Sequence, residues 1–193
     1  MLYGPAIRAT ASVSGRNGRV CSSPSAYGSH PPPRRHLLPR GAPTYAAARR
    51  TWTGNIGKHP ALIARCAGTA DVQQAVNFAR DRGLLLSVRG GGHSAPGYGG
   101  NDGGLVIDMA PMKGIHVDPG KRTARVQSGV LWKEFDHETQ AFGLATTGGT
   151  VSNTGVVGLT LGGGLGCLMA RPARRRDNFR SAAVLPPCRR SRP

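Results

Sequence analysis

The residues best able to do chemistry form one short run, Arg89-Gly90-Gly91-Gly92-His93-Ser94. Three glycines in a row cost backbone entropy, so a chain keeps them where it turns tightly or where a ligand touches the main chain. Successive N–H groups in such a loop can form a nest for anionic oxygens. A histidine beside the nest offers a nucleophilic nitrogen near neutral pH. The alternative interpretation is a glycine hinge that carries a surface histidine.

Two more glycine clusters lie downstream of this loop, Gly97-Tyr98-Gly99-Gly100-Asn101-Asp102-Gly103-Gly104 and Gly162-Gly163-Gly164-Leu165-Gly166. Neither has the G-x-G-x-x-G spacing of a dinucleotide fingerprint, and the chain contains no G-x-x-x-x-G-K-[ST] phosphate loop. A nicotinamide-dependent Rossmann enzyme and a nucleoside triphosphatase are therefore both disfavoured. The position of the first cluster after an apolar strand still favours a ligand, because α/β proteins bind ligands at strand ends.

A strand, a helix and a second strand must position the first glycine loop. We expect a strand over 60–66, a helix with Thr69 as its N-cap and Gly83 as its C-terminal stop, and a strand over 84–88 that is too apolar to have a solvated face. The helix is expected to bury one face, formed by Val72, Ala75, Val76 and Ala79. This order predicts a βαβ unit.

The rest of the patterned region predicts shorter elements. They are a helix-prone stretch over 46–50, a strand over 104–108, a hairpin of 115–118 and 123–127 turning at Pro119-Gly120, and a helix over 131–142 closed by Gly143. Leu131, Phe135 and Phe142 are expected on the inner side of that last helix. From 146 to 166, glycine and β-branched residues predict tight loops beside a buried strand. The fold class is therefore mixed α/β, in the broad sense that includes α+β.

The net charge of +17 over 193 residues is concentrated at the two ends of the chain. Residues 1–50 carry +8, residues 51–169 carry only +2, and residues 170–193 carry +7. We expect a disordered basic leader over 1–43, a folded body over 44–169 and an Arg/Pro-rich divergent tail over 170–193. The tails lack the interleaved aromatic residues of single-strand binders, so a nucleic-acid partner is disfavoured.

Other functional classes are disfavoured by composition and spacing. No run approaches the roughly 20 apolar residues of a transmembrane helix, and arginines interrupt every candidate secretory signal, so no membrane partner is expected. The four cysteines form no C-x-x-C pair, which disfavours a zinc site or a disulfide framework and favours the cytoplasm. His116 and His137 are interpreted as structural or solvated, and Cys66 as a small buried hydrophobe.

Eight ordered pieces of the sequence resemble the FAD-linked oxidases of the vanillyl-alcohol oxidase type. The pieces are 60–66, 71–80, 88–94, 103–108, 112–114, 123–127, 141–145 and 158–166. Each piece is weak alone, but together they are specific over about 60% of the chain. The chain looks most similar to the berberine-bridge-enzyme-like and 6-hydroxynicotine-oxidase-like members. The resemblance implies a mixed-sheet FAD-binding domain of the PCMH type, incomplete at its C-terminal side.

The resemblance also implies the cofactor and its contacts. In that family the Arg-Gly-Gly-Gly-His loop wraps the FAD pyrophosphate, and its histidine, matched here by His93, bonds covalently to the flavin 8α-methyl. Tyr98 lies beside this loop, while Gly148, Gly149 and the 162–166 cluster resemble a second cofactor-lining wall. Many members carry a second covalent link through a cysteine, but Val151 stands at that position and Cys167 is offset from it. A single histidyl link is therefore expected.

The resemblance weakens after Met169, where Arg- and Pro-rich residues replace the family pattern. We interpret the chain as a truncated or frameshifted relative that lacks the substrate domain. Three functions stay open. The first is an FAD-dependent oxidoreductase acting on a small-molecule substrate, the second is a non-catalytic FAD-binding fragment, and the third, least favoured, is a basic nucleic-acid-binding protein.

Overall fold

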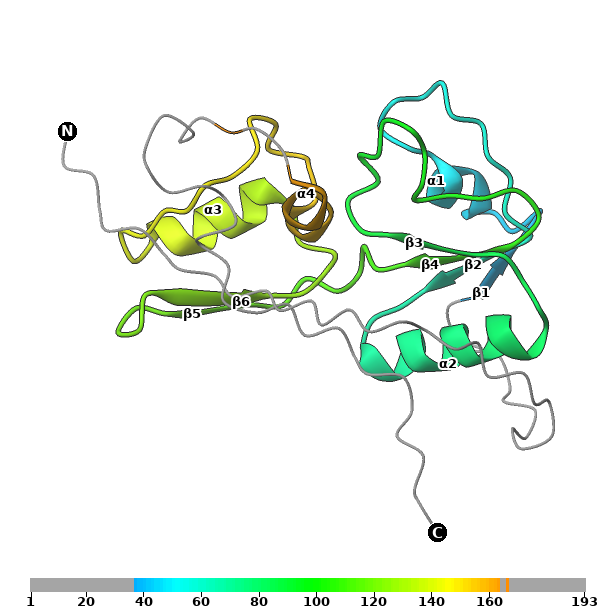
Figure 1. Cartoon of the computed structure of the whole chain (residues 1–193), viewed down its shortest axis with the longest axis horizontal. Coiled ribbons are helices and arrows are strands. Elements are labelled where there is room, and N and C mark those ends of the chain that lie inside the picture. Colours follow the sequence, from blue (N-terminus) through cyan, green and yellow to red (C-terminus); the bar gives the residue numbers. More distant parts are fainter. Residues whose placement is uncertain (1–36, 164–165, 167–193) are drawn as a thin grey trace, which may run out of the picture.

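The computed structural model describes residues 37–163 and 166. In this part the elements are β1 (Leu37–Pro39), α1 (Tyr45–Arg49), β2 (Leu62–Arg65), α2 (Thr69–Asp81), β3 (Leu86–Arg89), β4 (Leu105–Asp108), β5 (Ile115–Asp118), β6 (Thr123–Val126), α3 (Trp132–Gln140) and α4 (Val156–Gly162). Figure 1 shows two groups of elements. The sheet of β1 to β4 has α1 and α2 on opposite faces, and the β5–β6 hairpin lies beside α3 and α4.

The four-stranded sheet is mixed, with strand order β1-β2-β4-β3. β1 runs antiparallel to β2, whereas β2 and β3 both run parallel to β4. The expected βαβ unit is present as β2, α2 and β3, but β4 lies between its two strands and pairs with both. The mixed α/β prediction is confirmed, and so is the hairpin, in which Ile115 pairs with Val126.

The core follows the two-residue alternation of the strands. Leu105 and Ile107 of β4 face α2 and pack with Ala75 and Phe78, and Val106 belongs to the cluster on the other face, beneath α1. A separate cluster holds the second group together and contains Val130, Trp132, Phe135 and Val156. Every residue of β4 is buried, so this strand is the centre of the fold.

Helix α2 differs from its predicted start and its predicted face. Thr69 is its first helical residue and Gly68 its N-cap, because the Asp71 carboxylate accepts hydrogen bonds from the N–H groups of Ala67 and Gly68. The buried face is formed by Ala75, Phe78 and Ala79, and Val76 is exposed. Gly83 ends the helical region with φ +60°, as expected.

The prediction that the strand over 84–88 has no solvated face is wrong. β3 is at the edge of the described sheet, and Leu85, Leu86 and Val88 are 63%, 36% and 49% exposed. An edge strand pairs with a neighbour on one side only. The apolar composition of 84–88 did not reveal that β3 occupies this position. The glycine loop therefore follows an edge strand.

Two expectations for the second group are also wrong. Phe142 is exposed, because α3 ends at Gln140 and buries Trp132, Phe135 and Thr139 instead. The region over 146–163 contains helix α4, where tight loops beside a buried strand were expected. Its seven residues include two glycines, which lowered the helical signal of the sequence. Gly143, with φ +63°, does close α3 as predicted.

Regular structure begins before the predicted boundary at residue 44. Leu37 pairs with Ala64 and Leu38 with Ile63, so β1 extends the sheet into the segment assigned to a disordered leader. Leu37 and Leu38 also pack against the clusters on the two faces of the sheet. Residues 1–36 of the predicted leader over 1–43, and the predicted tail over 170–193, lie outside the described residues. No helix within the described ranges combines the length and the apolar character needed to cross a bilayer.

A matched glycine pair tests the packing of β4. A Cβ at Gly104 would collide with the main-chain carbonyl oxygen of Leu85, whereas a Cβ at Gly158 in α4 meets no atom within 4 Å. We expect Gly104→Ala to lower the free energy of unfolding by at least about 2 kcal/mol. Gly158→Ala should raise it by about 0.5–1 kcal/mol. Urea unfolding measures both, and a neutral Gly104→Ala would contradict the structure.

The buried Cys66 thiol gives a second test. Burial, aided by the charges of Asp71 and Asp108, raises its pKa from 9.0 to about 12. Native protein and native Cys66→Ser should therefore take up the same number of iodoacetamide labels at pH 8, and only the unfolded wild type should take up one more. Since the folded thiol keeps its proton longer than the unfolded thiol, its contribution to stability is complete below pH 9 and is lost toward pH 12. One extra label on native wild type would contradict this burial.

Candidate functional site

The three glycines of the loop after β3 are needed for two different reasons. A Cβ at Gly90 would lie 2.9 Å from the carbonyl oxygen of Ser128, and one at Gly91 would lie 2.5 Å from the nitrogen of Gly155. Gly92 has φ +70°, a conformation that favours glycine. Close main-chain packing thus requires the first two glycines, and a left-handed turn requires the third.

The main-chain N–H groups of this loop have no partners within residues 37–163 and 166. Gly90, Gly91, Gly92, His93 and Ser94 donate no backbone hydrogen bond there, although the Gly92 carbonyl accepts one from Trp52. Five successive unpaired donors in a glycine loop are the arrangement that binds anionic oxygens. The arrangement therefore fits a phosphate-containing ligand.

His93 lies against an aromatic residue that the sequence analysis did not single out. Its imidazole stacks on the Trp52 indole with ring centroids 4.1 Å apart and planes inclined by 23°. Its Nε2 atom is buried and has no hydrogen-bond partner in the described structure. A buried nitrogen without a partner is the feature expected of a group that completes its bonding with a ligand.

The Arg89 side chain turns away from the loop and forms a buried ion pair. Its Nη2 atom lies 2.9 Å from Asp108 Oδ2, and the two side chains are only 10% and 2% exposed. Arg89 Nε also donates to Asp108 Oδ1 at 3.3 Å, and the same oxygen accepts from the Ala110 N–H. Asp108 thus also satisfies a main-chain N–H group just after β4. The Arg89 side chain holds the end of β3, and only its main chain borders the donors.

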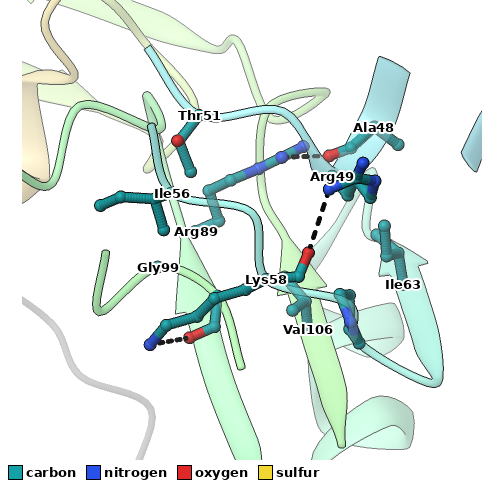
Figure 2. A pocket seen from close by; sticks show the side chains of 11 residues that line it. Ala48, Arg49, Thr51, Ile56, Lys58, Ile63, Arg89, Gly99 and Val106 are labelled. Carbon is teal, nitrogen blue, oxygen red and sulfur yellow. Dashed lines mark hydrogen bonds between the residues drawn. The ribbon is translucent and has the colours of Figure 1, made fainter. Parts of the chain in front are cut away.

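The same guanidinium attaches the segment over 48–58 to the site. Arg89 Nη1 donates to the carbonyl oxygens of Ala48 and Arg50. Farther along, Lys58 Nζ donates to the Gly100 carbonyl at 3.3 Å. Figure 2 shows Arg89 reaching across to Ala48, with a small pocket between this segment and the strands.

The remaining predicted residues lie in different surroundings. Ser94 Oγ accepts a hydrogen bond from the Tyr98 N–H at 3.1 Å, whereas the Tyr98 side chain is 77% exposed. The atoms nearest to a Cβ at Gly148 belong to Trp132, and those nearest to one at Gly149 belong to Leu159 and Trp132. These two glycines are therefore packing positions of the second group.

The third glycine cluster is described only in part. Gly162 ends α4, and Gly163 follows with φ +85°. Gly164 lies outside the described residues, and Gly166 is described as an irregular position. His116 and His137, which the sequence assigned to structural or solvated roles, are both exposed.

Sequence reasoning missed two residues of the site. Trp52 stands in the turn Thr51-Trp52-Thr53-Gly54, where an aromatic residue among small polar ones is a recognisable signal. Gly155 contacts Gly91 through main-chain atoms alone. A single glycine between Thr154 and Val156 carries no signal of such a contact, which only the fold creates.

The family model described as FAD binding domain matches residues 60–187 of the chain. This stretch includes β2 to α4 and the glycine loop, and it extends past Met169, where the sequence pattern weakens. The chain therefore belongs to the FAD binding domain family of the FAD-linked oxidases. Its fold is that of the PCMH-type FAD-binding domain, of which the described residues form a part.

Curated relatives agree with this assignment. The chain is 39% identical over 141 residues to the (R)-6-hydroxynicotine oxidase of Paenarthrobacter nicotinovorans, a match that covers 73% of this chain and 31% of the relative. It is 38% identical over 131 residues to an FAD-linked oxidoreductase of Dictyostelium discoideum, covering 67% and 28% of the two proteins. The chain thus spans about a third of the length of these relatives.

Solved structures agree as well. The crystal structure of 6-hydroxy-D-nicotine oxidase from Arthrobacter nicotinovorans matches with a TM-score of 0.71 and 34% identity, over 82% of this chain and 34% of that one. The BBE-like 1 protein of Physcomitrella patens matches with a TM-score of 0.59 and 27% identity, over 65% and 28% of the two chains. The predicted resemblance, fold class and cofactor are confirmed.

The two arginines at Asp108 provide a matched test of the loop's support. Arg65 Nε lies 3.6 Å from Asp108 Oδ2, but its side chain is 46% exposed. Arg89→Ala leaves the buried carboxylate without its close partner and should lower the free energy of unfolding by about 3 kcal/mol. Arg65→Ala should cost less than about 1 kcal/mol. Chemical unfolding measures both, and equal effects would contradict the asymmetry.

Proposed function

We propose that this chain is the flavin-holding part of an FAD-dependent oxidoreductase and that the loop over 90–94 holds the FAD pyrophosphate. The observation that carries the proposal is the row of five main-chain donors that have no partner among the described residues, beside a buried His93 nitrogen that also has none there. Bound FAD would supply an acceptor for the two electrons of a substrate C–H bond. The chain's own part is to bind the anionic cofactor and to keep its reactive end beside His93.

We propose further that His93 bonds covalently to the flavin methyl group. The new bond joins an imidazole nitrogen to the methyl carbon, and it replaces one N–H and one C–H bond. Two electrons and two protons leave in total, and dioxygen, reduced to hydrogen peroxide, is the oxidant that balances them. The imidazole side chain suits this step because its second ring nitrogen can release the proton.

Turnover of a small organic substrate is the first candidate activity, and it is a proposal because the chain spans about a third of the length of its relatives. The second candidate is a flavin-binding unit without turnover. It is supported because this chain contains both the glycine loop and His93. A nucleic-acid partner has little support, because the net charge of the patterned region over 51–169 is only +2. We propose a cytoplasmic location, and the free thiol of the buried Cys66 supports it.

Acid precipitation tests the flavin assignment. After incubation with FAD and air, the wild-type pellet should keep flavin absorbance, and His93→Ala should lose it while still binding FAD reversibly, because the main-chain donors remain. His116→Ala is the matched control, since His116 is an exposed histidine on β5. A wild-type protein that binds no FAD in equilibrium dialysis would overturn the cofactor role.

A further inference from the structure

The stack of Trp52 on His93 is a part of the site that the flavin assignment leaves unexplained. Trp52 is 62% exposed, which is unusual for an indole that has an ordered aromatic contact. A surface tryptophan normally samples several side-chain conformations. Something in the fold must therefore hold this one over the imidazole.

The main chain of Trp52 is joined to the glycine loop directly. Its N–H donates to the Gly92 carbonyl at 3.1 Å, next to His93 in the sequence. The turn that carries it is closed by a hydrogen bond from the Gly54 N–H to the Thr51 carbonyl, and Gly54 has the required φ of +64°. The indole and the imidazole thus extend from two chain segments fixed to each other.

Both ends of the segment are also anchored. Before Trp52, the Arg89 guanidinium donates to the Ala48 and Arg50 carbonyls, as Figure 2 shows for Ala48. After it, Ile56 packs so closely on Gly97 that a Cβ there would lie 2.7 Å from the Ile56 Cγ2 atom. The ion pair that stabilises the end of β3 therefore also sets the position of Trp52.

Within the described residues, neither ring nitrogen of His93 forms a hydrogen bond that would orient the imidazole, and Nε2 is buried. Functional histidines are usually oriented by a hydrogen bond from the ring nitrogen that does not react. In this structure the Trp52 ring is the group that contacts the imidazole face. We propose that Trp52 is a positioning residue for His93, which holds the imidazole plane by stacking so that a ring nitrogen meets the flavin methyl. That the ring nitrogen meets the flavin methyl rests on the proposed function.

Two substitutions separate stacking from bulk. Trp52→Leu removes the aromatic ring, and Trp52→Phe keeps an aromatic surface. Phe142→Leu is the matched control, because it removes an exposed aromatic ring just after α3. A stacked aromatic pair is worth about 0.5–1.5 kcal/mol. The first-order rate of covalent flavin attachment at saturating FAD should therefore fall about three- to tenfold in Trp52→Leu. It should recover in Trp52→Phe and stay unchanged in Phe142→Leu.

A second measurement uses the protein without FAD. The ring protons of His93 should resonate upfield of those of the exposed His116 and His137, and this shift should disappear in Trp52→Leu. Wild-type attachment rates in Trp52→Leu, with flavin lost in His93→Ala, would overturn the role of Trp52 and leave the proposed function intact. If wild type forms no covalent flavin, the covalent proposal fails and the ring-proton shift alone decides whether Trp52 holds His93. An unshifted His93 would overturn the inference in either case.

Discussion

The ion pair between Arg89 and Asp108 is the interaction on which the rest of the site depends. Both partners are at strand ends, on β3 and β4, and both side chains are almost wholly removed from water. A buried carboxylate is tolerated only when it is paired, so the arginine cannot turn outward to the glycine loop. Its remaining donors reach the Ala48 and Arg50 carbonyls instead. One guanidinium thus links the sheet, the loop and the segment that carries Trp52.

The sequence predicts the elements of this protein better than it predicts their surroundings. Strand β4, the β5–β6 hairpin and the glycine stops of α2 and α3 depend on local patterns, and all are confirmed. The exposure of β3 and of Phe142 depends on which neighbours the fold supplies, and an apolar composition does not contain that information. Helix α4 was not predicted, because Gly158 and Gly162 weaken the apolar periodicity by which longer helices are recognised.

In the candidate site, too, local residue patterns are predicted and contacts between distant residues are not. The run 90–94 is visible in the sequence because glycine and histidine are themselves the signal, and together with seven other pieces it indicates the family and the cofactor. The role of Arg89 could not be predicted, because its partner Asp108 is 19 residues away and becomes a neighbour only through the pairing of β3 with β4. Trp52 is farther still from His93 in the chain. Contacts of this kind come from topology, and residue types alone do not predict them.

The contact between Gly91 and Gly155 has a mechanical consequence for the two groups of elements. Gly155 is the N-cap residue of α4, and it touches the loop through main-chain atoms with no side chain between them. A side-chain contact can relax by changing rotamers, but a main-chain contact can only move as a whole. Neither glycine has a side chain that could adjust to a shift of the other, so the positions of the loop that carries His93 and of the first turn of α4 are coupled.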